Sequence, residues 1–173
     1  MKQFLFTALA LVAFATSKAQ NVSLNVILKP IQTLTIKEEQ KVVNLEYATT
    51  GDYQNGVSKT NDDHLTIYST GGFQVKVKAT DANMTLNGKN MAVTTIKLSS
   101  SAGSQALTNA TYQQDLSLSS SEATLVSSSN GAVNKSVNVK YQGAGANAYI
   151  DNYVPNQNPS IYKATLVYTI VSA

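Results

Sequence analysis

Residues 22–29 read Val-Ser-Leu-Asn-Val-Ile-Leu-Lys, and residues 162–170 read Tyr-Lys-Ala-Thr-Leu-Val-Tyr-Thr-Ile. In both stretches apolar and polar residues alternate. A period of two places the apolar residues of each stretch on one face of a β-strand. The two stretches therefore predict strands near both ends of the chain. The first strand, being N-terminal, is free to pair within its own domain or with a neighbouring molecule.

The interior of the chain repeats this alternation between turn signals. Residues 73–79, Phe-Gln-Val-Lys-Val-Lys-Ala, form the clearest internal strand, and Asn87-Gly88 between short apolar runs predicts a hairpin with a type I′ turn. Shorter strands are expected at residues 34–36, 43–47, 64–69, 96–98, 116–118 and 137–141, a further core contact at 125–126, and loops at 51–63, 99–114 and 147–160. No stretch after residue 20 has the spacing of a long amphipathic helix. This pattern predicts an all-β protein, an antiparallel β-sandwich of about 7–10 short strands.

The N-terminal 19 residues have the layout of a secretory signal peptide. A lysine at position 2 precedes the apolar run 4–15, and Ser17-Lys18-Ala19 supplies small side chains before Gln20. The apolar run is too short to span a bilayer. We therefore expect an exported protein of the cell surface, the periplasm or the extracellular space, whose mature chain does not insert into a membrane. Residues 20–173 are expected to form a single domain.

The composition excludes some classes of function. The chain has no cysteine, so no disulfide supports the fold. All 13 basic residues are lysines, and without Lys2 and Lys18 they nearly balance the 10 acidic residues. Nucleic-acid binding needs a basic stripe, usually with arginine, and is not expected.

A catalytic site is not indicated. His64 is the only histidine, and it follows Asn61, Asp62 and Asp63. The chain lacks the Gly-x-Ser-x-Gly motif of a nucleophile elbow. We read His64 as a solvated loop residue and expect neither an enzyme nor a cofactor.

Two sets of residues are weak candidates for ligand binding. Asp62, Asp63 and Asp151 offer oxygen ligands for calcium, although they lack the spacing of a known calcium loop. Most tyrosines are expected to pack at half-buried strand positions. Tyr149 and Tyr153 flank Asp151 in the loop 147–160 and are the aromatic residues most available to a ligand.

The energetics of the first strand decide how it is used. Burying Val22, Leu24, Val26 and Leu28 contributes about 1.5 to 3 kcal/mol for each side chain. Fixing the backbone costs about 1 to 2 kcal/mol for each residue. Because the two sums nearly cancel, the strand needs backbone hydrogen bonds as well, and we expect its apolar face to be covered at the edge of a sheet.

The order of these segments resembles a family of small secreted proteins of Bacteroidota. The resemblance is carried by residues 21–30, 45–53, 65–79 and 162–170, and it spans nearly the whole mature chain. More distantly, the layout is similar to the spore-coat-U-like subunits of archaic chaperone-usher pili. That resemblance implies an immunoglobulin-like, pilin-like sandwich that is completed by a neighbour's N-terminal strand. It implies that the donor residues are Val22, Leu24, Val26 and Leu28, and that the partners are further copies or related subunits, a periplasmic chaperone and an usher. The chain departs from the pilins in lacking a cysteine pair and the usual Leu-x-Phe-Gly step in residues 34–41.

The sequence thus favours a structural or adhesive subunit of the cell surface that polymerises by donor-strand exchange. The alternative is a monomeric extracellular or envelope module that binds glycan or calcium through the loops containing Asp62, Asp63, Tyr149, Asp151 and Tyr153.

Overall fold

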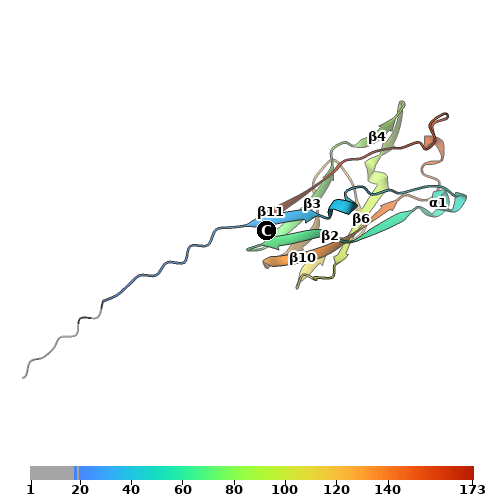
Figure 1. Cartoon of the computed structure of the whole chain (residues 1–173). Coiled ribbons are helices and arrows are strands. Elements are labelled where there is room, and N and C mark those ends of the chain that lie inside the picture. Colours follow the sequence, from blue (N-terminus) through green and yellow to red (C-terminus); the bar gives the residue numbers. More distant parts are fainter. Residues whose placement is uncertain (1–17, 19) are drawn as a thin grey trace, which may run out of the picture.

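The protein is an all-β sandwich of antiparallel sheets, with its N-terminal segment projecting from one end (Figure 1). The computed structural model describes Lys18 and residues 20–173. The expected signal peptide therefore lies, apart from Lys18, outside the described residues. None of the described helices is long and apolar enough to cross a membrane.

The first sheet has five strands in the order β1-β2-β10-β6-β8. Its central strands are the two longest of the described chain, β2 (Ser58–Ser69) and β10 (Ala132–Gly143). The edges are β1 (Gln32–Ile36) on one side and, beyond β6 (Ile96–Ala102), the short β8 (Leu116–Ser117) on the other. Every pair in this sheet is antiparallel.

The second sheet has four strands in the order β11-β3-β9-β7. The central strands are β3 (Phe73–Ala79) and β9 (Ala123–Ser128), and the edges are β11 (Leu166–Ser172) and β7 (Ala110–Tyr112). The seven residues of β11 pair with the seven of β3, from Leu166 opposite Ala79 to Ser172 opposite Phe73.

A separate hairpin joins β4 (Asn83–Leu86) to β5 (Lys89–Ala92). Asn87 and Gly88 both have positive φ, 47° and 79°, as the expected type I′ turn requires. The helices are short, as expected: α1 (Thr50–Asn55) and the 3₁₀ turns η1 (Glu38–Gln40), η2 (Val93–Thr95) and η3 (Ile150–Asn152). Thr49 and Asp52 form a capping box at the start of α1.

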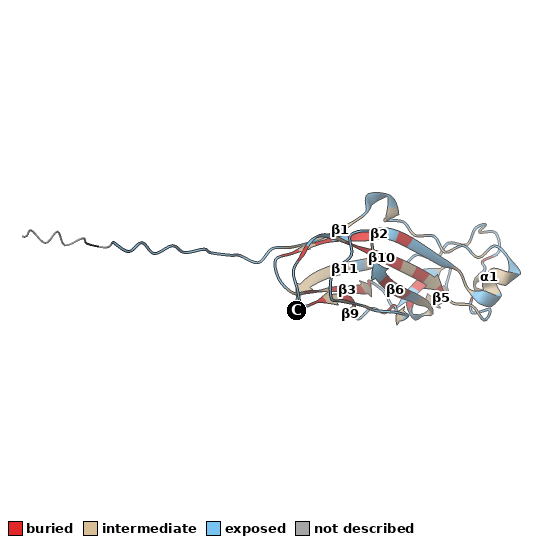
Figure 2. Ribbon diagram, turned by 90° about the horizontal axis from the view of Figure 1, so that it is seen from below, coloured by how far each residue is buried: buried red, intermediate tan, exposed pale blue. Residues whose placement is uncertain are grey.

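The core lies between the two sheets and follows the alternation of the sequence (Figure 2). Strand β3 alternates strictly, with Phe73, Val75, Val77 and Ala79 buried. Leu65 and Ile67 from β2 and Val137 and Val139 from β10 face them and are fully buried, at 0% exposure. The inward residues of the central strands are therefore sealed from water.

Two loop predictions were wrong in part. The expected loop 51–63 contains α1 and the first half of β2, because Ser58 to Asp63 continue the strand although they carry no apolar rhythm. The expected loop 99–114 contains the end of β6 and all of β7. Serine, threonine and asparagine fill these strands, so their sequence lacks the pattern that identifies a half-buried strand.

Candidate functional site: an apolar tail and an open seam

The first predicted strand is not paired within its own domain. Residues 20–29, here called the tail, extend away from the sandwich (Figure 1) and belong to no sheet of the described chain. The four predicted donor residues are among the most exposed apolar side chains: Val22 at 91%, Leu24 at 87%, Val26 at 76% and Leu28 at 87%. The expectation that a sheet covers this face is not met in the single chain.

The side of the sandwich next to the tail is open. Strand β1 is the edge of one sheet and β11 is the edge of the other, and the two lie next to each other. No ladder joins them among the described residues. We call this side the seam. Its inward-facing apolar residues pack against the core but are only half-buried: Leu34, Ile36, Leu166, Tyr168 and Ile170.

The backbone of both edge strands also points into the seam. Thr80 N donates to Thr165 O, and Ala173 N donates to Gly72 O, so odd-numbered residues of β11 face β3. Because backbone groups alternate in an antiparallel edge strand, the N–H and C=O of Leu166, Tyr168 and Ile170 face the other way. The seam thus combines half-covered apolar side chains with backbone groups available for another strand.

The same reasoning holds for β1 on the other wall of the seam. Lys37 N donates to His64 O, and Ile31 O accepts from Thr70 N, so the odd-numbered residues face β2. The backbone groups of Leu34 and Ile36 therefore face the seam.

The opposite side of the sandwich is closed. There Ser100 N of β6 donates to Gln113 O, and Gln113 N donates to Leu125 O of β9. The Ser100 hydroxyl also donates to Leu125 O at 2.7 Å. These bonds connect the two sheets on that side, so the openness of the seam is not a general property of the sandwich edges.

The segment after β1 has the form of a strand that lacks a partner. Val43, Leu45 and Tyr47 are half-buried and alternate with the exposed residues Asn44 and Glu46, as the sequence predicts for a strand. No strand is assigned to it, because no neighbour within the described chain forms a ladder with it. Val43 and Leu45 pack against the same core as the seam residues. This segment therefore lies extended over the core without belonging to either sheet.

A buried polar chain reaches the base of the seam. The His64 Nε2 atom lies 2.8 Å from the Tyr141 hydroxyl, which lies 2.5 Å from the Tyr168 hydroxyl. The Gln40 amide nitrogen donates to Asp62 O, so its Oε1 faces His64 Nδ1 at 3.0 Å and accepts a hydrogen bond from Nδ1–H. The neutral ring then accepts from Tyr141 at Nε2. This chain connects β2 and β10 of one sheet to the edge strand β11 of the other.

His64 is thus a structural residue of the core rather than the solvated loop residue that we expected. It is only 2% exposed, and burial lowers its pKa below the ordinary value of 6.5. Burial also raises the pKa of Tyr141 to about 12 and that of Tyr168 well above 10. Within the described chain no carboxylate is bonded to the ring, so the geometry does not include a Ser-His-Asp arrangement.

The candidate calcium ligands do not meet. Asp63 accepts hydrogen bonds from the Ser136 side chain and from Ser104 N, which lower its pKa, whereas Asp62 lies on the exposed face of β2. Asp151 lies in η3, where its carbonyl oxygen accepts from Lys89 Nζ. Among the residues that the structure describes, no three acidic or histidine side chains form a group that could hold a metal ion.

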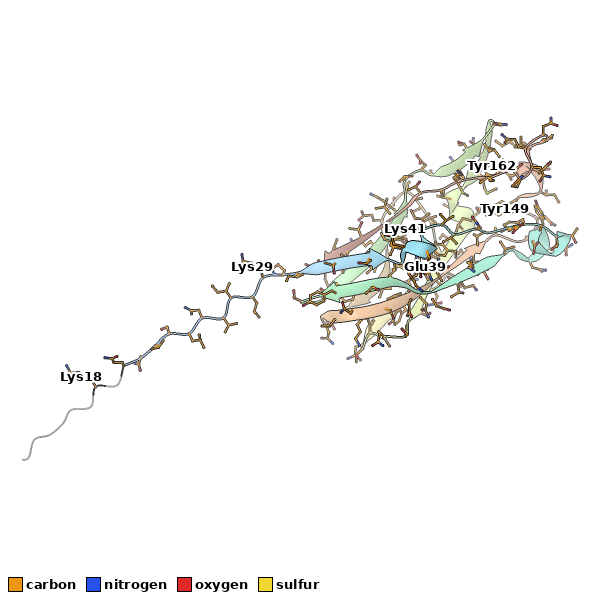
Figure 3. The ribbon with its side chains drawn as sticks, viewed as in Figure 1. Lys18, Lys29, Glu39, Lys41, Tyr149 and Tyr162 are labelled. Carbon is orange, nitrogen blue, oxygen red and sulfur yellow. The ribbon has the colours of Figure 1, made fainter. Side chains whose placement is uncertain are left out.

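Only one of the two tyrosines that we expected to be available to a ligand is exposed. Tyr153 is 50% exposed, but Tyr149 is buried, with its hydroxyl 2.7 Å from the Thr95 hydroxyl. Tyr149 also packs edge-on against Tyr47 (5.1 Å between ring centroids), so it holds the loop to the sandwich (Figure 3). Lys89 and Asn90 of β5 hold the same loop from outside by bonds to the carbonyl of Tyr153 and the side chain of Asn152.

Sequence reasoning identified the tail and missed the seam. The alternation at residues 166–170 was visible, but alternation gives the inward face of a strand and not its place at an edge. A search of protein-family models finds no match for the chain, and a search of the curated proteins finds none either.

Proposed function

We propose that this protein is an exported, non-enzymatic structural or adhesive subunit of the cell surface that polymerises into a pilus-like fibre. In this fibre the tail of one molecule fills the seam of the next. The observation that carries the proposal is the coexistence, in one chain, of a bare apolar strand and an open seam. The first lacks a sheet and the second lacks a strand.

The two parts match in chemistry. The tail offers four apolar side chains on one face, and the wall formed by β11 offers Leu166, Tyr168 and Ile170 in the same period of two. Insertion along β11 would bury these side chains and would give the backbone of the tail an edge to pair with. The neighbouring molecule would then supply both contributions that stabilise the tail as a strand, namely burial of its apolar side chains and hydrogen bonds to its backbone.

The direction in which the tail is inserted decides how successive molecules are arranged. The beginning of β1 and the end of β11 lie at the tail end of the sandwich, because Ile31 bonds to Thr70 and Ala173 to Gly72. A tail that runs antiparallel to β11 therefore enters from the opposite end, where α1 lies (Figure 1). Successive molecules are then arranged head to tail, and the contact can repeat without closing.

The test uses a tail-less chain, residues 30–173, and a synthetic peptide of residues 20–29. The peptide should raise the Tm of the tail-less chain, because a ligand that binds only the folded state stabilises it. The control is a peptide of the same composition in which Leu24 and Asn25 are exchanged, which breaks the alternation and should have a much smaller effect. Equal effects of the two peptides, or no shift with either, would contradict the proposal.

A further inference from the structure

The root of the tail carries a second apolar surface. Ile27, Leu28 and Ile31 line an open hollow together with Tyr68 of β2 and Val133 of β10. Ile27 is 81% exposed, Val133 66% and Ile31 51%. We call this surface the root hollow.

Ile27 does not belong to the donor face. It falls between Val26 and Leu28, at a position where Ser23, Asn25 and Lys29 are polar. In an inserted tail its side chain would point away from the core of the receiving molecule. An apolar residue at this outward position needs a different partner, and the root hollow is where it lies.

A matching surface lies at the other end of the sandwich. Ile150, Tyr153 and Ile161 are 61%, 50% and 55% exposed. The loop and the segment before β11 are held together there, since the Tyr162 hydroxyl donates to Asn152 O at 2.7 Å and Val154 N donates to Ser160 Oγ at 2.9 Å. We call these three residues the mouth patch, because Ile161 lies where the extended lead into β11 begins. Figure 3 shows Tyr162 at that end and Lys29 at the root of the tail.

We infer that the root hollow of each molecule docks on the mouth patch of the copy that receives its tail. The inference rests on the proposed function and specifies the second contact between subunits. The hollow lies directly after the donor residues in the chain. A molecule that receives residues 22–28 in its seam must therefore place part of its own surface against the hollow of the donor molecule.

The register supports this pairing. With the tail antiparallel to β11 and Val22 opposite Ile170, Leu24 lies opposite Tyr168 and Val26 opposite Leu166. The same register then places Leu28 opposite Ala164 and Ile31 opposite Ile161. Each residue advances about 3.3 Å along a strand, so Ile31 lies within about 10 Å of Leu28. When Val22 to Leu28 occupy the seam of the receiving molecule, the root hollow is therefore brought to its mouth patch.

Cysteine cross-linking tests the contact directly, because the protein has no cysteine of its own. Val133→Cys and Ile161→Cys chains, residues 20–173, are mixed and oxidised, and the products are separated on a denaturing gel. We expect a disulfide dimer between the two variants. The control replaces Val133→Cys with Lys97→Cys, an exposed position on β6 that belongs to neither surface, and should give little dimer.

The outcomes separate this inference from the proposed function. A dimer formed by Val133→Cys with itself would overturn the inference, because it would place two tail ends together as in a reciprocal pair. So would a lack of cross-link in mixtures that do form multimers. Failure of the proposed function is recognised independently, by a tail-less chain that does not respond to the 20–29 peptide.

A second variant gives a quantitative test. Val133→Asp changes an exposed side chain and leaves the tail intact, so the fold and the peptide response of its tail-less form should be unchanged. Multimer formation by the 20–173 chain should weaken about tenfold, as for the loss of one buried apolar contact. Unchanged multimer formation would overturn the inference.

Discussion

A second proton on His64 reverses one of the hydrogen bonds that hold its ring. Nδ1 already donates its hydrogen to Gln40 Oε1, and Nε2 accepts from the Tyr141 hydroxyl only while it is unprotonated; a protonated Nε2 has to donate to Tyr141 instead. Burial of the ring also disfavours the charged form. The neutral histidine is therefore part of the connection between the two sheets at the base of the seam.

Stability should consequently fall in mild acid. The pKa of His64 is lower in the folded than in the unfolded chain, so the unfolded chain binds more protons below about 6.5, the ordinary value. The stabilisation is complete above that pH and is lost as the pH falls through the folded pKa. The Tm measured from pH 7.5 down to pH 5 should decline, and His64→Gln should make the decline shallower.

The carboxylates act in a lower pH range and serve as an internal control. Hydrogen bonds lower the pKa of Asp52 and Asp63, whose ordinary value is 3.8, so their stabilisation is present above that value and is lost in stronger acid. A decline between pH 7.5 and pH 5 that is identical in His64→Gln would show that His64 is not its cause.

At the scale of single elements, the β4–β5 hairpin isolates the effect of backbone conformation. A Cβ atom added at Gly88 would meet nothing within 4 Å, and the same is true at Gly71. Only Gly88 has a positive φ, 79°. Gly88→Ala should therefore lower the free energy of unfolding by about 1 kcal/mol, whereas Gly71→Ala should be nearly neutral. Urea unfolding of both variants measures the difference, and equal values would contradict the argument.

The elements that the sequence predicted are those in which local signals and tertiary environment agree. Phe73 to Ala79 alternates because one face meets the core, and Asn87-Gly88 adopts the turn that its residue types favour. The first half of β2 was missed because Lys59 and Asp62 face solvent and only Asn61 is buried there.

The sequence predicted one part of the candidate site, the tail, and not the other, the seam, for a physical reason. The tail is a local pattern of four apolar residues and is visible in any reading of the sequence. The seam depends on which strands lie at the edges of two sheets, and this is a property of long-range pairing. Nothing near Leu34 or Leu166 in the sequence reports that each lacks a neighbour on one side.

At the scale of the whole molecule, assembly should depend on the tail and on its alternation. The chain 20–173 should form multimers whose size grows with concentration, and the chain 30–173 should remain monomeric. Leu24→Asp should abolish multimers, while Asn25→Asp adds the same charge on the outward face and should have little effect. Light scattering after size exclusion measures the masses. A 20–173 chain that stays monomeric and soluble with its apolar tail bare would contradict the proposed function.

The closed side of the sandwich sets the valence of the molecule. Because Gln113 bonds to strands of both sheets, only one side can admit an added strand, and the chain has a single N-terminal segment to give. A polymer built from such units is unbranched and polar. One terminus always presents an unfilled acceptor and the other an unused donor, so growth at the two termini is chemically distinct, and a capping molecule need block only one of them.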